Sequence, residues 1–465
     1  MQYKDGRELK MKRVSNKQTG LIFFPAFDWA ISPTHPEREE RLLYTRDQIF
    51  EEGIMDLPQI IEFAPKLATV HDVARVHFCV PRVKDQTTEA HLIAAGAAIL
   101  LAEQIVAGNI LNGFALVRPP GHHAMRVVHG NRGFCNINNE AIMIEKLRSR
   151  YGINRIAVVD TDVHHGDGTQ DIFWHDPDVL FISFHQDGRT LYPGTGFTYE
   201  LGGPKAFART INIPLPPGTT DESLMYVVDN LIVPVLKDFK PDFIVNSAGQ
   251  DNHYTDPLGS MRITAQGYAR LTEKLKPDIA VLEGGYAIET ALPYVNMAII
   301  LALAGLDYSE VREPDYWPGR FKESPERKAQ VQRLVEELLK YWEMRDKASP
   351  DPKSVNGRFY QRKRRIFYDT DYIEEIQFES LKLCDDCPGY LSIDSTANHG
   401  YGRTGKVLCL SVPFKACSVC RAEAAETYER SKKDRDYQYV YLQDKAADTF
   451  LGYEVSTGQE WFSNG

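Results

Sequence analysis

The sequence predicts an α/β protein with an open, mostly parallel sheet flanked by helices, followed by a small C-terminal module. Short apolar runs alternate with helical patterns over the first two-thirds of the 465 residues. Polar side chains with reactive groups follow directly after some of these runs. Four of the 7 cysteines lie in two Cys-x-x-Cys pairs near the C-terminus, which indicates a separate metal-stabilised unit.

Six short apolar runs predict the buried strands of this sheet. They are Leu21–Phe24, Phe114–Val117, Arg155–Val159, Val179–Ser183, Phe243–Val245 and Ile279–Leu282. Helical patterns lie between them, at residues 91–107, 138–149, 223–238, 264–275 and 288–304. Parallel strands need crossover connections that are long enough to hold a helix, so this alternation favours a parallel sheet.

A proline-containing stretch between Pro314 and Pro325 marks the predicted end of the α/β domain. We therefore divide the chain into residues 1–318 (α/β domain), 319–365 (helical extension and linker) and 366–465 (C-terminal module).

The extension begins with an amphipathic helix, because its apolar residues recur at helical spacing. They are Val331, Leu334, Val335, Leu338, Leu339 and Trp342. A linker is expected at Ala348–Pro352. The basic run Arg362–Arg365 follows, and we interpret it as a solvated face.

The composition, with 43% hydrophobic and 25% charged residues, is typical of a globular protein. The longest apolar run, Leu92–Ala102, is interrupted at Glu103 and suits a buried helix more than a membrane span. The polar N-terminus has no secretory h-region, so we expect a cytoplasmic protein with no membrane partner. A net charge of −10 argues against nucleic-acid binding and would suit a cationic substrate. The oligomeric state stays open, a homo-oligomer included.

Asp162, His164 and Asp251 are the predicted ligands of a catalytic zinc ion. They follow the third and fifth apolar runs, and reactive groups collect beyond the carboxyl ends of strands in an open parallel sheet. Two carboxylates and one imidazole leave a coordination position open, which is typical of catalytic zinc. The alternative is that Asp162 and His164 only cap a helix, but capping gives no role to Asp251.

Seven motifs in one order resemble those of the zinc-dependent histone deacetylase superfamily, which includes class II-type lysine deacetylases and acetylpolyamine amidohydrolases. They are His35–Arg41, Arg118–Ala124, Gly133–Asn139, Asp160–Gly168, Tyr192–Gly196, Ser247–Asp251 with Asp256–Gly259, and Glu283–Tyr286. The resemblance covers about the first two-thirds of the chain. It implies an arginase/deacetylase-type sheet and hydrolysis of an amide.

The resemblance also implies roles for the remaining catalytic side chains. His122 and His123 form an acid–base pair in which His123 carries the proton, as histidine can near neutral pH. Asp160 and Asp167 orient these imidazoles. Tyr286 donates a hydrogen bond to the carbonyl oxygen as negative charge develops there. Structural histidines and a core tyrosine are the alternative interpretations.

The expected substrate tunnel has Phe134 and Tyr192 as walls, Gly133 and Leu258 at the opening, and Arg41 at the floor. Ordinary core aromatics and a surface arginine are the alternatives. Polyamine-selective relatives can carry a carboxylate where this chain has Leu258, so leucine favours a lysine-type substrate.

Two departures from the family pattern concern the rim of the tunnel. The loop Met125–Arg132 is longer than usual, and Asp85 is the candidate for the family's rim aspartate, although the spacing around it is poor. A potassium ion is a further expected cofactor. Its site would be formed by the backbone of Asp160, Asp162, His164 and Phe184 and the hydroxyl of Ser183.

The C-terminal cysteines predict a second, structural zinc ion of ribbon type. The pairs Cys384/Cys387 and Cys417/Cys420 have 29 residues between them. Four thiolates leave no open coordination position, so this metal should stabilise the fold. Four unrelated thiols, or a redox pair, are the alternatives.

Together these predictions describe a zinc-dependent amidohydrolase that removes acyl groups, acetyl first among them, from lysine side chains or related amines. An acetylpolyamine amidohydrolase is the alternative within the same chemistry. A non-catalytic binding or scaffold protein on the same fold is the alternative from another class. An arginase-like two-manganese enzyme would need bridging carboxylates, and none is evident beside His164.

Overall fold

The computed structural model describes residues 18–317, 319–347, 352–400 and 402–462. Its first sheet has eight strands. They are β1 (Thr19–Phe24), β2 (Ile60–Glu62), β4 (Asn112–Val117), β6 (Ile156–Asp160), β7 (Val179–Gln186), β8 (Thr210–Leu215), β9 (Phe243–Ala248) and β10 (Ile279–Leu282). The strand order is β2-β1-β4-β10-β9-β6-β7-β8, and every neighbouring pair is parallel. The predicted parallel α/β sheet is therefore confirmed.

All six predicted strands are present, and the two that were not predicted, β2 and β8, form the edges of this sheet. β2 is only 3 residues long. β8 contains Pro214, which cannot donate a ladder hydrogen bond. An edge strand tolerates proline because only one of its sides is paired.

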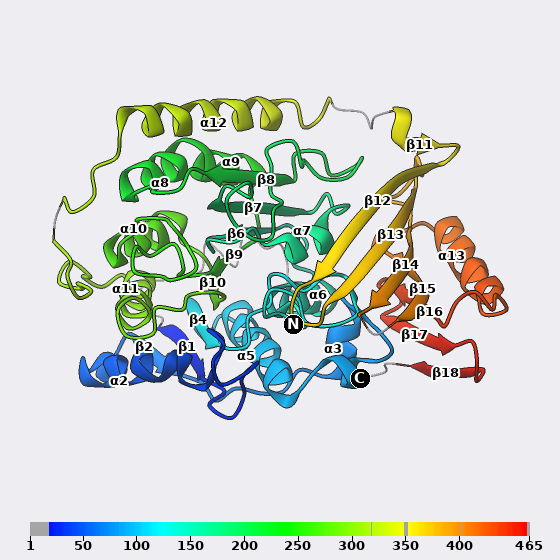
Figure 1. Ribbon diagram of the computed structural model, residues 1–465, viewed down its shortest axis with the longest axis horizontal. Helices are drawn as coiled ribbons and strands as arrows, with labels where there is room; N and C mark the ends of the chain where they lie inside the picture. The colour runs from blue at the N-terminus through cyan, green and yellow to red at the C-terminus, as the bar shows by residue number, and fades with distance from the viewer. Residues whose placement is uncertain (1–17, 318, 348–351, 401, 463–465) are drawn as a thin grey trace.

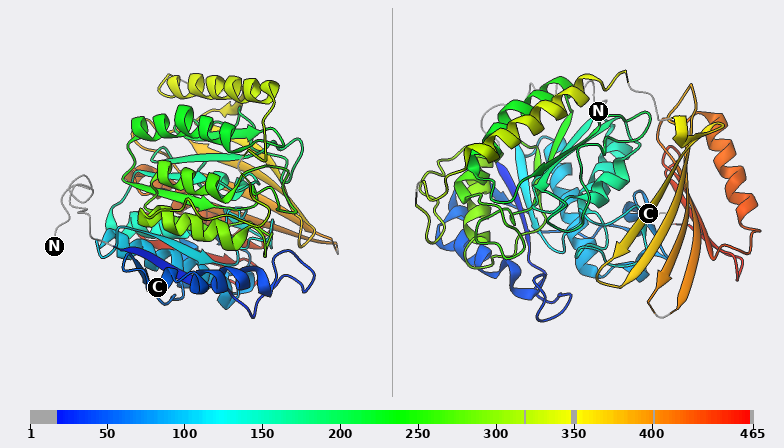
Figure 2. Two further views of the ribbon diagram at one scale, coloured as in Figure 1. Left: turned by 90° about the vertical axis from the view of Figure 1, so that its left-hand side faces the viewer. Right: turned by 45° about the horizontal axis from the view of Figure 1, so that its top comes forward.

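The helices of this domain lie on both faces of the sheet (Figures 1 and 2). They are α2 (Leu43–Glu51), α3 (Val70–Ala74), α4 (Val83–Gln86), α5 (Glu89–Val106), α6 (Asn139–Tyr151), α7 (Asp167–Phe173), α8 (Asp221–Val227), α9 (Val233–Phe239), α10 (Ala265–Leu275), α11 (Leu292–Ala304) and α12 (Pro325–Glu343). A π-helical turn, η3 (Val228–Ile232), joins α8 to α9. Two short strands, β3 (Phe78–Cys79) and β5 (Val127–Val128), pair separately.

Side chains of each central strand alternate between two hydrophobic cores. In β4, Phe114 and Leu116 belong to the core that α10 and α11 cover, whereas Ala115 and Val117 belong to the core that α5 and α6 cover. A strand buried on both faces reads as a continuous apolar run, which is why these strands were predictable. α5 is long and apolar enough to cross a membrane by length and composition, but 72% of it is buried inside this fold.

The predicted amphipathic helix is α12, which packs along α8 and β8 and closes one core. Its buried face consists of Val331, Val335, Leu338 and Trp342. The indole nitrogen of Trp342 also donates to Asp238 at 2.8 Å. The linker predicted to follow, Ala348–Pro352, lies largely outside the described residues.

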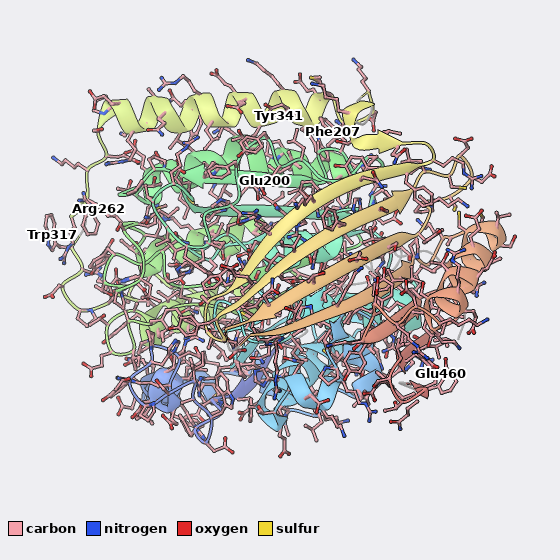
Figure 3. The ribbon with its side chains drawn as sticks, turned by 45° about the vertical axis from the view of Figure 1, so that its right-hand side comes forward. Glu200, Phe207, Arg262, Trp317, Tyr341 and Glu460 are labelled. Carbon is pink, nitrogen blue, oxygen red and sulfur yellow. The ribbon has the colours of Figure 1, made fainter. Side chains whose placement is uncertain are left out.

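The C-terminal part forms a second eight-stranded sheet whose strands follow chain order. They are β11 (Val355–Asn356), β12 (Phe359–Tyr368), β13 (Ile373–Lys382), β14 (Leu391–His399), β15 (Arg403–Val412), β16 (Tyr439–Asp444), β17 (Thr449–Glu454) and β18 (Gln459–Phe462). Neighbours are antiparallel except β15 and β16, which are parallel and joined through α13 (Ser418–Ser431). Figure 3 shows β12 to β15 slanting across one side of the molecule.

Two predictions about this region need correction. The boundary at residue 366 falls inside β12, so the C-terminal sheet begins earlier, at Val355. The basic run Arg362–Arg365 is not a uniformly solvated face. Successive side chains of a strand point to opposite sides, so Lys363 and Arg365 are exposed while Arg362 and Arg364 point inward. Both inward arginines pair with buried Glu379.

The C-terminal sheet packs closely on the α/β domain. Phe78 and Val127 of that domain share a hydrophobic cluster with Leu381, Leu391 and Ile393 of the sheet. Polar contacts surround this cluster. They include Arg75 with Asp448 at 2.9 Å, Lys445 with Glu145 at 2.8 Å, and Arg364 with Asp171.

We expect Leu338→Ala to destabilise the protein by about 2–5 kcal/mol, because it opens a cavity between α12 and the core. The adjacent Glu337→Ala is the matched control, since Glu337 is exposed on the same helix and should cost about 0.5 kcal/mol or less. Urea unfolding followed by circular dichroism measures both. Equal unfolding midpoints for the two variants would show that α12 does not pack as described.

Candidate metal centre and active site

The three predicted zinc ligands converge at the carboxyl ends of two neighbouring strands. Asp162 and His164 follow β6, Asp251 follows β9, and these strands pair directly. Their ligand atoms all lie within 4.8 Å of one another. Nδ1 of His164 is 3.0 Å from Oδ1 of Asp162 and 3.1 Å from Oδ2 of Asp251. The sequence prediction that these residues meet is therefore matched by the geometry.

This cluster places two buried carboxylates beside one imidazole, a combination that favours a cation. Burial lowers the pKa of His164, but the hydrogen bonds to Asp162 and Asp251 outweigh it and raise this pKa to about 10. Two carboxylates and one imidazole at this spacing fit the three-ligand set of a catalytic zinc ion. These residues would hold the ion with a coordination position left for water or substrate.

Two glycines allow the backbone to approach this cluster. A Cβ on Gly249 would lie 2.1 Å from Oδ2 of Asp162 and 2.4 Å from its Cα. A Cβ on Gly284 would lie 2.3 Å from Oδ2 of Asp251. The backbone N–H of Gly284 instead donates to Oδ2 of Asp162 at 2.7 Å. The tight packing fixes the orientation of both carboxylates.

The histidine pair lies in the loop after β4, and each ring is held by its predicted carboxylate. Nδ1 of His122 is 3.1 Å from Oδ2 of Asp160, and Nδ1 of His123 is 2.8 Å from Oδ1 of Asp167. Burial and the neighbouring His122 lower the pKa of His123 to about 3. His123 is therefore neutral near pH 7 and can accept a proton through Nε2.

Glu283 supports this loop, a role that the sequence did not reveal. Its Oε2 accepts hydrogen bonds from the backbone N–H groups of Gly121 at 2.7 Å and His122 at 3.0 Å. Burial raises the pKa of Glu283 to about 7. Its position directly before the Gly-Gly-Tyr sequence is the one available signal, but its partners lie about 160 residues away and only the fold brings them together.

Tyr286 follows β10 and packs over Arg41. Gly285, at φ 120°, makes the turn that places Tyr286. The backbone N–H of Tyr286 donates to Oδ2 of Asp256 at 2.6 Å. The guanidinium of Arg41 lies 4.8 Å from the centre of the Tyr286 ring. Arg41 is fully buried, donates to the carbonyl of Gly285 at 2.8 Å and pairs with Glu37 at 2.7 Å. The alternative of a surface arginine is thus wrong.

The two predicted aromatic walls flank the same site. The ring of Phe134 is 5.6 Å from that of Tyr286, and the ring of Tyr192 is 5.2 Å from that of His123, centre to centre. Gly133 touches the catalytic loop, because a Cβ there would lie 2.4 Å from Cδ2 of His123.

For three other expected residues, the structure shows no hydrogen bond to the catalytic side chains described above. Leu258 is half-buried, and its N–H donates to Asp256 at 2.9 Å. Ser183 lies opposite Asp160 in the sheet, and its hydroxyl is 2.9 Å from Nδ1 of His185. The potassium site stays a prediction. Asp85 is exposed on α4.

A carboxylate of the C-terminal sheet contacts the residues expected at the rim. Oδ1 of Asp369, in the turn between β12 and β13, accepts hydrogen bonds from the N–H of Gly133 and the hydroxyl of Tyr192, both at 2.9 Å. No sequence motif connects Asp369 with these residues, so only the tertiary structure could identify it.

The four C-terminal cysteines also converge. Sγ of Cys384 is 4.0 Å from that of Cys417, and Sγ of Cys387 is 3.6 Å from that of Cys420. Four thiolates around a tetrahedral zinc ion, with bonds of about 2.3 Å, would lie roughly 3.8 Å apart. A hydrogen bond from the N–H of Cys420 lowers the pKa of Cys417 to about 7, which favours the thiolate.

This cluster joins two elements of the C-terminal module to each other and to the α/β domain. Cys384 and Cys387 lie between β13 and β14, whereas Cys417 and Cys420 begin α13, so only the first pair lies on a hairpin. Nζ of Lys205 donates to the carbonyl of Cys387 at 2.7 Å and also to that of Cys384.

Comparisons with known proteins agree with this geometry. A model of the histone deacetylase domain matches residues 80–302. A probable deacetylase of Archaeoglobus fulgidus is 44% identical over 358 residues, which cover 70% of this chain and 98% of that protein. The histone deacetylase-like amidohydrolase of Pseudomonas aeruginosa is 36% identical over 231 residues, which cover 48% of this chain and 60% of that protein.

Among solved structures, that of the HDA15 HD domain matches with a TM-score of 0.61 and 27% identity, covering 71% of this chain and 97% of that one. The family match ends at residue 302, so the C-terminal sheet, which starts at Val355, lies outside it.

We expect the purified protein to bind one metal ion in each of the two clusters. His164→Ala should remove only the ion of the Asp–His–Asp cluster, and Cys417→Ser only that of the four-cysteine cluster, because the clusters share no ligand. Each variant is the control for the other. Elemental analysis of the purified proteins measures this. Loss of both ions from one single variant, or a metal-free unchanged protein, would contradict the assignment.

Proposed function

The chain belongs to the zinc-dependent histone deacetylase superfamily, and from this membership we propose that it removes acyl groups, acetyl first among them, from lysine side chains or related amines. Its relatives make it a hydrolase that acts on amides. The observation that supports the proposal most is the meeting of the Asp162–His164–Asp251 cluster with two carboxylate-bound histidines at one edge of the sheet.

In the proposed mechanism, Asp162, His164 and Asp251 would hold a zinc ion. When bound, that ion polarises the substrate carbonyl and lowers the pKa of water. His123 takes the proton from the attacking water and passes it to the departing amine. Asp167 keeps the imidazole of His123 in the tautomer with its free Nε2 toward the reacting atoms, because it accepts the hydrogen bond from Nδ1.

The other polar groups stabilise charge as the carbonyl is attacked. Tyr286 donates its hydroxyl to the carbonyl oxygen, where negative charge develops. Burial raises the pKa of Tyr286 well above its ordinary value, so the hydroxyl keeps its proton. In this scheme His122 transfers no proton and contributes only its charge. Burial lowers the pKa of His122, but the negative charges of several carboxylates, first Asp162 and then Asp160, raise it well above its ordinary value.

The walls of the tunnel suit an unbranched chain. Phe134 and Tyr192 would contact the methylene groups of a lysine or polyamine substrate on opposite sides. Burial of these methylenes contributes about 0.8 kcal/mol each.

An acetylpolyamine amidohydrolase is a second candidate, and one observation favours it. Asp369 contacts Gly133 and Tyr192 at the rim, and Asp371 accepts a hydrogen bond from the N–H of Asn131 at 2.6 Å. These carboxylates attract a second ammonium group on a small substrate. Rates on acetylated putrescine, acetylated spermidine and ε-acetyl-lysine peptides separate the two candidates.

We expect His123→Ala to lower kcat by about 10²- to 10⁴-fold, because His123 carries the proton in the proposed mechanism. Tyr286→Phe should lower it by about 10²- to 10³-fold, since only the hydroxyl is lost. The measurement is amine release from a panel of ε-acyl-lysine peptides and acetylpolyamines.

Tyr341→Phe is the control for these variants, because Tyr341 lies on α12, outside the site, and loss of its hydroxyl should leave kcat unchanged. The proposed function would be excluded if the protein without substitutions released no more amine than His123→Ala from any of these substrates, whatever the length of the acyl group. A non-catalytic binding protein would then be favoured.

A further inference from the structure

The loop 125–133, which borders the active site, is held by the C-terminal sheet. The N–H groups of Asn131 and Gly133 donate to Asp371 at 2.6 Å and Asp369 at 2.9 Å. The hydroxyl of Tyr368 donates to the carbonyl of Val127 at 2.9 Å. The loop Met125–Arg132, with Gly133 directly after it, is therefore the surface on which the β12–β13 hairpin docks.

Arg132 joins this hairpin to the catalytic histidine. Its Nε donates to the carbonyl of Phe367, in β12, at 3.0 Å. Its other two nitrogens pair with both oxygens of Asp167, at 2.7 and 2.6 Å. Oδ1 of the same carboxylate is 2.8 Å from Nδ1 of His123. A continuous chain of hydrogen bonds thus runs from the C-terminal sheet to the acid–base residue.

The geometry of Arg132 fixes the carboxylate more firmly than a single hydrogen bond would. A guanidinium that binds both oxygens defines the plane of a carboxylate. Arg132 is buried, with 6% of its surface exposed, and its third donor direction is taken by the carbonyl of Phe367. Rotation of Asp167 would therefore break both bonds to Arg132, a guanidinium that the carbonyl of Phe367 holds in place.

The backbone beside Arg132 also needs outside support. Phe134 has a φ of 70°, in the left-handed region, which is unfavourable for a residue with a side chain. Gly133, at φ 52°, lies against the His123 ring. The hydrogen bond from Gly133 to Asp369 stabilises this strained turn, and Asp369 at the same time binds the hydroxyl of Tyr192.

We infer that Arg132 is a positioning residue which the C-terminal sheet holds against Asp167, so that the C-terminal module is a working part of the active site. The inference rests on the proposed function, because it assigns Arg132 a task within that reaction. Arg132 does not touch the substrate in this scheme. It acts through Asp167 on the orientation of His123.

The test compares Arg132→Gln and Arg132→Lys with Asp448→Asn in the full-length, metal-loaded protein. Asp448→Asn is the matched control, because Arg75 and Asp448 form another arginine–aspartate contact between the same two parts of the chain and share no residue with the catalytic pair. Metal content and unfolding midpoints are measured for every variant.

Arg132→Gln should lower kcat about 10- to 100-fold, as loss of a supporting hydrogen bond does at comparable sites, with little change in KM. A merely structural contact would not change kcat selectively. Arg132→Lys should recover part of kcat, because lysine keeps the charge but cannot bind both oxygens. Asp448→Asn should keep the kcat of the unchanged protein. A kcat for Arg132→Gln no lower than that of Asp448→Asn would overturn the inference.

If Arg132→Gln does not fold or loses its metal, Arg132→Lys decides: a reduced kcat with fold and metal retained supports the inference, and an unchanged kcat overturns it. A second readout does not depend on turnover. The Nδ1 proton of His123, bonded to Asp167, gives a downfield NMR resonance that should shift or broaden in the Arg132 variants and not in Asp448→Asn. An unchanged resonance overturns the inference, whereas absence of hydrolysis by the unchanged protein contradicts only the proposed function.

Discussion

Two buried carboxylates, Asp162 and Asp251, meet beside His164, and the rest of the site depends on the need to neutralise them. Buried charge is costly unless it is paired and hydrogen-bonded. Here the N–H of Gly284 binds Asp162, the imidazole of His164 lies between the two carboxylates, and a cation completes the cluster in our proposal. The parallel sheet makes this possible. β4, β10, β9 and β6 are consecutive neighbours, and the segment after each contributes one part of the site.

Each reactive side chain in the site is held by a second group from a distant part of the chain. Asp167 orients His123, and Glu283 binds the backbone of the loop that carries the histidines. Asp256 binds the backbone N–H of Tyr286 in the same way. Such support keeps reactive groups within a narrow range of positions, which catalysis by orientation requires. Packing around the glycines then leaves the cluster little freedom to rearrange.

The C-terminal sheet extends this support from outside the region that the family model matches. Its inward face is unusually polar, because Glu375, Gln377 and Glu379 of β13 are buried against the α/β domain while Phe378 between them is exposed. Buried ion pairs contribute little net stability, but they are directional. We interpret these contacts as the reason why the β12–β13 hairpin docks in one register, with Asp369 at the rim and the Phe367 carbonyl on Arg132.

The sequence by itself determined the parallel sheet, the six strands that lie between its two edge strands, and the residues of both metal clusters. Apolar runs mark strands buried on both faces, and reactive residues follow strand ends, so local patterns were sufficient. Only the tertiary structure decided which distant groups contact and orient these residues. Arg132 contacts Phe367 and Asp369 contacts Gly133, in both cases more than two hundred residues away, and neither contact leaves a local signal. Glu283 lies in a recognised motif, but its hydrogen bonds go to backbone groups about 160 residues away. The inward orientation of Arg362 and Arg364 could not be predicted for the same reason. A charged side chain is expected to be exposed unless its buried partner is known, here Glu379 for Arg362 and Asp171 for Arg364.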